Sequence, residues 1–133
     1  MKAYVLDTSA LLAHHRNEQG AARVQVLLED PEAEIHVAAP SVAEMARRLL
    51  ALGADVVTAR TVALEYAGLA TSVLAVDVAV AIRAFELGLA SITRLPLVDA
   101  LIAASASIIG ATLVHRDTHF DGLTLELVAT EVL

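Results

Sequence analysis

Four acidic residues suggest the chemistry of this chain, because each follows an apolar run or opens a helical segment. They are Asp7, Glu44, Asp99 and Asp117. In an open parallel sheet, ligands bind beyond the carboxyl ends of the strands, where the next helices begin. Carboxylates gathered there repel one another and raise one another's pKa values unless cations neutralise them. Mg²⁺ and Mn²⁺ prefer carboxylate and water oxygens, so the set predicts a divalent-cation site.

Each acid also has an ordinary structural explanation. Asp7 is a favoured residue at a helix N-cap, and Ser41 and Glu44 have the spacing of a capping box. Asp99 is expected in the first turn of a helix, where the helix dipole favours negative charge. Asp117 follows a predicted strand in a polar loop, where aspartate is common. Only their shared position at one sheet edge favours a common site.

Short apolar runs alternate along the chain with segments of helical spacing, which indicates crossover connections and a parallel sheet. We expect strands at 2–6, 35–39, 72–76, 111–115 and 125–128. We expect helices at 8–17, 20–29, 40–52, 55–68, 77–87 and 96–109. Strands 2–6 and 111–115 are largely apolar throughout, as in sheets covered by helices on both faces. The predicted fold is α/β, a three-layer α/β/α sandwich with a central parallel sheet, in a single domain over residues 1–133.

Composition excludes several classes of protein. The chain has 133 residues, 57% hydrophobic and 19% charged, which argues against disorder. It contains no cysteine, so a thiolate metal site is impossible. An acid at Asp7 and the lack of a long apolar stretch predict neither a signal peptide nor a membrane span, hence a cytoplasmic protein. The net charge of −7 differs from the basic footprint of nucleic-acid binders, so an RNA substrate would need bound cations and local arginines.

The acids lie within local motifs that resemble a known family when taken in order. The motifs are Val5-Leu6-Asp7-Thr8-Ser9-Ala10-Leu11-Leu12, Pro40-Ser41-Val42-Ala43-Glu44, Leu95-Pro96-Leu97-Val98-Asp99-Ala100-Leu101-Ile102-Ala103 and Leu113-Val114-His115-Arg116-Asp117-Thr118-His119-Phe120. As a set they resemble the PIN-domain ribonucleases, and most closely the VapC toxins of bacterial VapBC toxin–antitoxin systems. The resemblance extends over essentially the whole chain, and the first and third motifs are the most specific.

The resemblance implies an Mg²⁺-dependent endoribonuclease, with Mn²⁺ as the alternative metal. The acidic quartet would hold the metal, and Asp7 and Asp99 would be its principal ligands. Ser9 would support the site by hydrogen bonding. Many relatives carry a further acid two residues after the fourth, where this chain has His119; Asp121 is an alternative ligand on that side. The family also implies a cognate antitoxin partner and a homodimer.

Other polar residues fit structural roles at least as well as functional ones. We expect His14 and His15 to lie at the surface or in an interface, and His36 to be a structural histidine. We expect Thr8 to help cap the first helix. Arg116 is the basic residue expected nearest the site, because it adjoins Asp117.

Two arginines and one apolar stretch remain open. Arg47 and Arg48 follow Glu44 by about one helical turn and either reach a substrate phosphate or lie in solvent. The apolar stretch 73–90 is expected to belong to the core or to a dimer interface.

Two other functions remain open, and the sequence disfavours a third. A PIN nuclease that processes RNA without being a toxin would use the same acids. A non-catalytic PIN-like binding module could dispense with them. An aspartyl-phosphate phosphatase would need a second acid where Ser9 stands and a suitably placed lysine, and Lys2 is the only lysine. The number of metal ions and the identity of the RNA also stay open.

Overall fold

A central sheet organises the fold of the computed structural model, which describes residues 1–133. The strands are β1 (Lys2–Leu6), β2 (Ala33–Ala38), β3 (Ser72–Leu74), β4 (Thr112–His115) and β5 (Thr130–Val132). They form one five-stranded sheet in the order β3-β2-β1-β4-β5. Every neighbouring pair is parallel, which confirms the predicted sheet.

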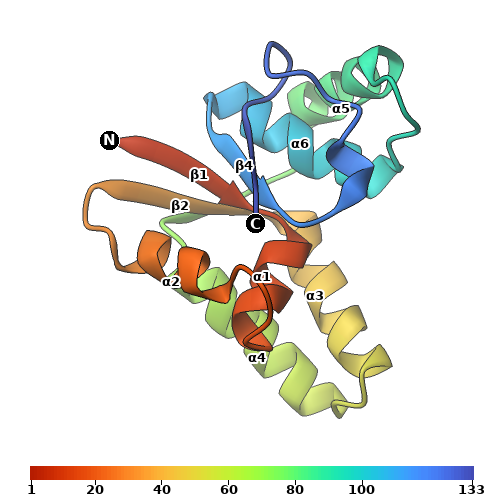
Figure 1. Ribbon diagram of the computed structural model, residues 1–133. Helices are drawn as coiled ribbons and strands as arrows, with labels where there is room; N and C mark the ends of the chain where they lie inside the picture. The colour runs from red at the N-terminus through yellow and green to blue at the C-terminus, as the bar shows by residue number, and fades with distance from the viewer.

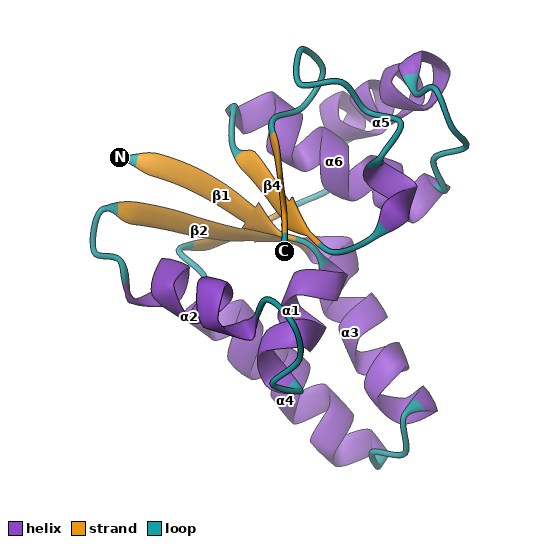
Figure 2. Cartoon of the chain, in the orientation of Figure 1, coloured by secondary structure: helices purple, strands orange, loops and turns teal.

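Six α-helices cover the two faces of this sheet (Figures 1 and 2). They are α1 (Thr8–His15), α2 (Ala21–Glu29), α3 (Ala39–Ala51), α4 (Val56–Leu69), α5 (Val78–Ala90) and α6 (Leu97–Ile109), and a 3₁₀ turn spans Thr118–Phe120. In this orientation α5 and α6 lie on one side of the strands and α1 to α4 on the other. The predicted α/β/α sandwich is therefore confirmed. None of the helices combines the length and apolar character required to cross a membrane.

Two hydrophobic cores fill the spaces between the layers, because side chains alternate between the faces of each strand. Val5 and Leu113 belong to the core beneath α5 and α6. Tyr4, Leu6 and Val114 belong to the core beneath α1 to α4. Strands with apolar residues on both faces are thus buried on both sides.

The chain reverses its direction of travel across the sheet between β1 and β4. From β1 it crosses to β2 and β3 on one side, and then returns to β4 on the other side. Leu6 is paired with Val114 in the register of these two central strands. Just beyond that pair, the Asp7 amide donates to the Val114 carbonyl at 3.1 Å. Asp7 and the loop after β4 therefore meet at the switch point, where open α/β sheets bind ligands.

The expected last strand at 125–128 is wrong, because this segment forms a turn and β5 lies at Thr130–Val132. The amides of Leu127 and Val128 both donate to the Thr124 carbonyl, at 3.0 and 3.1 Å. The apolar character of the segment reflects burial of Val128 in the core, where it is 3% exposed. The other elements agree with the predictions to within a few residues at their ends.

Gly122 joins the loop after β4 to the segment that leads into α6. Its carbonyl accepts from the Ile92 amide at 3.0 Å. A Cβ at this position would lie only 2.6 Å from the Thr93 amide nitrogen, so a side chain does not fit without backbone movement.

We therefore expect Gly122→Ala to lower the free energy of unfolding by about 1–3 kcal/mol, as overpacking of a tight contact does. Urea denaturation measures this change. Gly68→Ala in α4 is the matched control, because a Cβ there meets nothing within 4 Å. The control should be neutral or stabilising by up to about 1 kcal/mol, since alanine favours helix more than glycine. Equal stability of Gly122→Ala and wild type would contradict the close approach.

Candidate metal centre

Asp7 is the most deeply placed of the acids, with 2% of its surface exposed. It follows β1 and caps α1, since its Oδ1 accepts from the Ala10 amide at 2.9 Å. The same oxygen accepts from the Ser9 hydroxyl at 2.6 Å. Burial is the main cause that raises the pKa of Asp7 from 3.8 to about 7; the two hydrogen bonds oppose this rise, and the charges of Asp117 and Asp99 add to it. The capping role and a place in an acidic cluster therefore belong to one side chain.

Ser9 connects Asp7 to the other central strand. Besides donating to Asp7, its hydroxyl oxygen accepts from the Arg116 amide at 2.9 Å. Arg116 is the first residue after β4. One hydroxyl thus holds the ends of β1 and β4 together beside the acids.

Glu44 does not belong to a capping box, so this prediction is wrong. Helix α3 begins at Ala39 directly after β2, with Ala38 at its N-cap and Pro40 in its first turn. Ser41 therefore lies inside the helix, fully buried, and its hydroxyl has no partner. Glu44 is left free to point elsewhere.

The partner of Glu44 comes from α1. The Thr8 hydroxyl donates to Glu44 Oε1 at 2.7 Å. The expected capping role of Thr8 is therefore wrong, because Asp7 caps α1 and Thr8 instead orients an acid of α3. Two helices on the same side of the sheet are thereby joined at the site.

Asp99 and Asp117 meet through His119. Asp99 lies in the first turn of α6, as predicted, and is 9% exposed. His119 Nδ1 is 2.8 Å from Asp99 Oδ2 and 3.3 Å from Asp117 Oδ1. Asp117 Oδ1 also accepts from the His119 amide at 2.9 Å. One ligand atom from each of the three residues lies within 4.8 Å of the others.

All four predicted acids interact electrostatically at this edge. Burial raises the pKa of Asp99, and the charges of Asp117 and Glu44 raise it further, against the lowering effect of His119. Asp7 is affected by Asp117 and Asp99 in the same way. Asp99 thus links the acids of the central strands to Glu44 on α3.

His115 is a site residue that the sequence did not single out. It ends β4, is 2% exposed, and its Nδ1 accepts from the Asp117 amide at 3.1 Å. Its ring packs edge-on against Phe120, with centroids 4.8 Å apart. Burial lowers the pKa of His115, while nearby Asp121 and Asp117 raise it. Its position two residues before Asp117, at the end of an apolar strand, is the only sequence signal that could have indicated this role.

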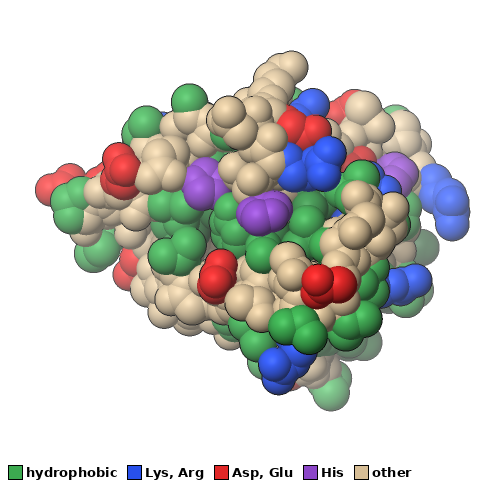
Figure 3. Space-filling view, turned by 90° about the horizontal axis from the view of Figure 1, so that it is seen from below, with side chains coloured by type: hydrophobic (Ala, Val, Ile, Leu, Met, Phe, Trp, Pro, Cys, Tyr) green, Lys and Arg blue, Asp and Glu red, His purple; other side chains and the backbone are tan.

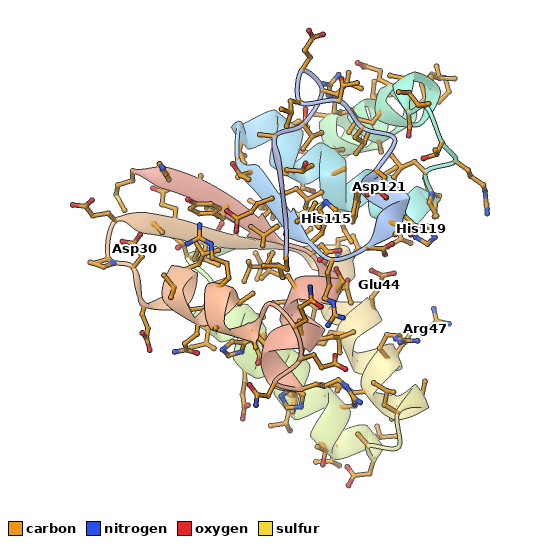
Figure 4. All side chains as sticks on the ribbon, in the orientation of Figure 1. Asp30, Glu44, Arg47, His115, His119 and Asp121 are labelled. Carbon is orange, nitrogen blue, oxygen red and sulfur yellow. The ribbon has the colours of Figure 1, made fainter.

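Figure 4 places the labelled residues at opposite ends of the sheet. Glu44, His119, Asp121 and His115 lie toward the carboxyl ends of the strands, whereas Asp30 lies at the other end. The charge of Asp121 raises the pKa of His115. Asp121 is not a member of the group formed by Asp99, Asp117 and His119.

No lysine or arginine neutralises the acids. The Arg116 side chain is paired with Glu18 at 3.9 Å. Arg47 and Arg48 line an open pocket with Glu44 but form no ion pair with it. On the face seen in Figure 3, Lys and Arg side chains are separate patches among apolar and acidic ones, so this face has no continuous basic surface.

Two of the other histidines take part in structural contacts. His14 is hydrogen-bonded to Tyr66 and Gln25 and so joins α1, α4 and α2. His36 Nδ1 is 2.7 Å from the Ser72 hydroxyl on the neighbouring strand. The contact of His36 agrees with the structural role expected for it. His14, expected at the surface or in an interface, instead joins three helices of this chain.

The donor set fits a divalent cation that prefers oxygen ligands. Asp7 is almost completely buried, and its Oδ2 accepts no hydrogen bond from the protein. Asp99 is also buried, and only one histidine contacts it. Buried carboxylates without a cationic partner are costly unless an ion balances them. Oxygen ligands of this kind suit Mg²⁺ or Mn²⁺.

Comparison with known proteins agrees with this fold. The family model described as PIN domain matches residues 4–124, and the chain therefore belongs to the PIN-domain family. No curated protein sequence gives a significant match.

Several solved structures share the fold at low sequence identity. The structure of VapBC2 from Rickettsia felis bound to a promoter DNA fragment matches with a TM-score of 0.76 and 15% identity, covering 98% of each chain. VapBC-5 from Mycobacterium tuberculosis matches with a TM-score of 0.66 and 24% identity, covering 100% of this chain and 98% of that one. VapC20 from Mycobacterium tuberculosis, described as a toxin that cleaves the sarcin–ricin loop, matches with a TM-score of 0.68 and 18% identity, covering 89% and 92%.

The raised pKa of Asp7 predicts a pH-dependent stability for the metal-free protein. A proton bound with a pKa of about 7 in the folded state and 3.8 in the unfolded state stabilises the fold fully below about pH 4. This stabilisation is lost as the pH rises through about 7. Asp7→Asn should therefore lack this pH-dependent stabilisation. The difference between the two pKa values corresponds to about 4 kcal/mol in the free energy of unfolding.

The measurement is urea unfolding of both proteins at pH 4 and pH 8 in the presence of a chelator. Asp7→Asn should gain stability relative to wild type between these pH values. Glu126→Gln is the matched control, because this acid is exposed, and its stability should follow that of wild type. A constant difference between Asp7→Asn and wild type across the range would contradict the prediction.

Proposed function

We propose that this protein is a divalent-metal-dependent endoribonuclease, the toxin component of a toxin–antitoxin system. It hydrolyses RNA phosphodiester bonds and is neutralised by a cognate antitoxin. The observation that carries the proposal is the group of buried acids at the switch point, with no lysine or arginine to balance them. Membership of the PIN-domain family supports it, and so do the similar folds of proteins described as VapBC toxin–antitoxin complexes.

Asp7 and Asp99 would be the principal ligands of Mg²⁺ or Mn²⁺. Glu44 and Asp117 would complete the water shell of that ion or hold a second one. When bound, such a cation supplies charge relief on the phosphate oxygens, a more acidic water and stabilisation of the leaving oxygen.

The rest of the site keeps these acids in position. Ser9 and the Ala10 amide occupy one oxygen of Asp7 and leave the other available. Thr8 likewise occupies Oε1 of Glu44. Carboxylates fixed in this way lose little conformational freedom on binding a ligand, which is the advantage of a preorganised site.

The substrate's phosphates require local cationic contacts, because the whole chain is acidic. Arg47 and Arg48 lie beside Glu44 in one pocket, and Arg116 lies beside Asp117 in another. These pockets flank the acids on the sides of α3 and of the loop after β4. Arginine at both positions offers a planar fork for phosphate oxygens.

We expect Asp99→Asn to abolish metal-dependent RNA cleavage, with a loss of at least about 100-fold, because it removes a principal ligand while keeping the shape of the side chain. Purified protein is assayed on total RNA with Mg²⁺ or Mn²⁺, and circular dichroism checks the fold. Glu65→Gln is the control, because it removes an exposed acid of α4, and it should cleave as wild type does. Full cleavage by Asp99→Asn would overturn the assignment.

The same pair of variants separates the alternatives when they are expressed in a bacterial host. Growth arrest by wild type, relieved by Asp99→Asn or by a protein from a neighbouring small gene, supports the toxin. Cleavage without growth arrest supports an RNA-processing PIN nuclease. RNA binding without cleavage supports a non-catalytic PIN-like module. Cleavage sites mapped in total RNA identify the target class.

We also propose that the protein forms a homodimer through α5. The inner face of this helix packs into the core through Val80, Ala84 and Leu87. Its outer face exposes apolar side chains at helical spacing, namely Val78 79%, Ile82 55%, Phe85 63% and Leu89 72%. A continuous apolar stripe of this kind is uncommon on a monomer and is typical of an interaction surface.

Phe85→Lys should therefore raise the dimer dissociation constant about 30-fold or more, as loss of a central aromatic contact does at many interfaces. Size-exclusion chromatography with light scattering across a concentration series measures it. Leu64→Lys on α4 is the matched control, with an exposed fraction of 49% in wild type, and it should remain dimeric. A monomeric wild type, or a Phe85→Lys variant that dimerises normally, would exclude this interface.

A further inference from the structure

The side chain of His119 contacts the acidic site, although the loop in which it lies does not need this contact to keep its shape. Its backbone amide already donates to Asp117, so the turn is closed without the side chain. The ring nevertheless turns its Nδ1 toward two carboxylates, Asp99 Oδ2 at 2.8 Å and Asp117 Oδ1 at 3.3 Å. The side chain is 53% exposed, so burial does not force this orientation. The contact with Asp99 is a hydrogen bond, so the carboxylates themselves orient the ring.

The three ligand atoms are spaced as the ligands of one ion are. A cation with octahedral bonds of 2.0–2.1 Å holds adjacent ligand atoms about 3 Å apart and opposite ones about 4 Å apart. The two distances from His119 Nδ1 match the adjacent spacing. All three atoms lie within 4.8 Å of one another. Nδ1 is therefore placed where a ligand to the same ion would be.

We infer that His119 is a direct nitrogen ligand of the divalent cation, and that it shifts the site's preference from Mg²⁺ toward later transition metals. The inference rests on the proposed metal site and adds to it a ligand and a metal preference. Imidazole suits Zn²⁺, Fe²⁺ and Ni²⁺, whereas carboxylates and water suit Mg²⁺ and Mn²⁺. An all-carboxylate site prefers these later metals less strongly, so one nitrogen ligand shifts the balance toward them.

The first test is spectroscopic and does not depend on cleavage. Pulsed EPR of the Mn²⁺-loaded protein should show the modulation from a coordinated imidazole nitrogen. This signal should vanish in His119→Asn. It should persist in His15→Asn, which removes an exposed histidine of α1. Circular dichroism checks that each variant is folded.

The second test is the affinity of the same proteins for Co²⁺ and Mg²⁺, measured by calorimetry. His119→Asn should weaken Co²⁺ binding at least about tenfold, the lower end of what loss of even an outer partner of a metal ligand costs. Mg²⁺ binding should change much less. His119→Asp replaces nitrogen by oxygen, so it should keep Mg²⁺ binding and lower the ratio of Co²⁺ to Mg²⁺ affinity.

The outcomes separate this inference from the proposed function. Mn²⁺ binding that Asp99→Asn abolishes, without a nitrogen signal, would overturn the role of His119 and leave the acidic metal site intact. A nitrogen signal that survives in His119→Asn would also overturn it. Failure of wild type to bind any of the three metals would overturn both proposals.

Discussion

Repulsion between buried carboxylates is the constraint on which this structure depends. The sheet brings Asp7 and Asp117 to neighbouring strand ends, and helix α6 adds Asp99 from above. Burial raises the pKa values of Asp7 and Asp99, and the neighbouring charges raise them further. Buried carboxylates are costly, so they are ordinarily absent from stable proteins or paired with a cationic group. The retention of these acids without lysine or arginine is the physical basis for proposing a metal at this edge.

The surrounding hydrogen bonds show how the fold holds these groups together. Ser9 joins the ends of β1 and β4, Thr8 joins α1 to α3, and His115 closes the turn before the last acid. Each bond acts on a carboxylate or on the backbone beside one. The same contacts that stabilise helix starts and strand ends thus orient the acids, so structural and functional explanations are not exclusive here.

The acidic surface limits where the proposed RNA substrate can bind. A chain with net charge −7 attracts RNA only where cations and arginines gather. Arg47, Arg48 and Arg116 are at the border of the acids and not within them. The proposed RNA binding therefore depends on a small region of the surface, and a protein partner of limited size is enough to cover it.

The sequence by itself determined the layers of the fold and the positions of the four acids. Apolar runs and helical spacing are local patterns, and parallel strands bring their carboxyl ends to one edge whatever their order. Only the tertiary structure decided which side chains meet. The predicted capping box at Ser41 does not form, because α3 starts directly after β2. Glu44 instead accepts a hydrogen bond from Thr8, 36 residues away. His119 reached Asp99, 20 residues away, because the loop after β4 packs against the segment before α6. Such contacts depend on strand order and loop packing, which no local preference of the chain encodes.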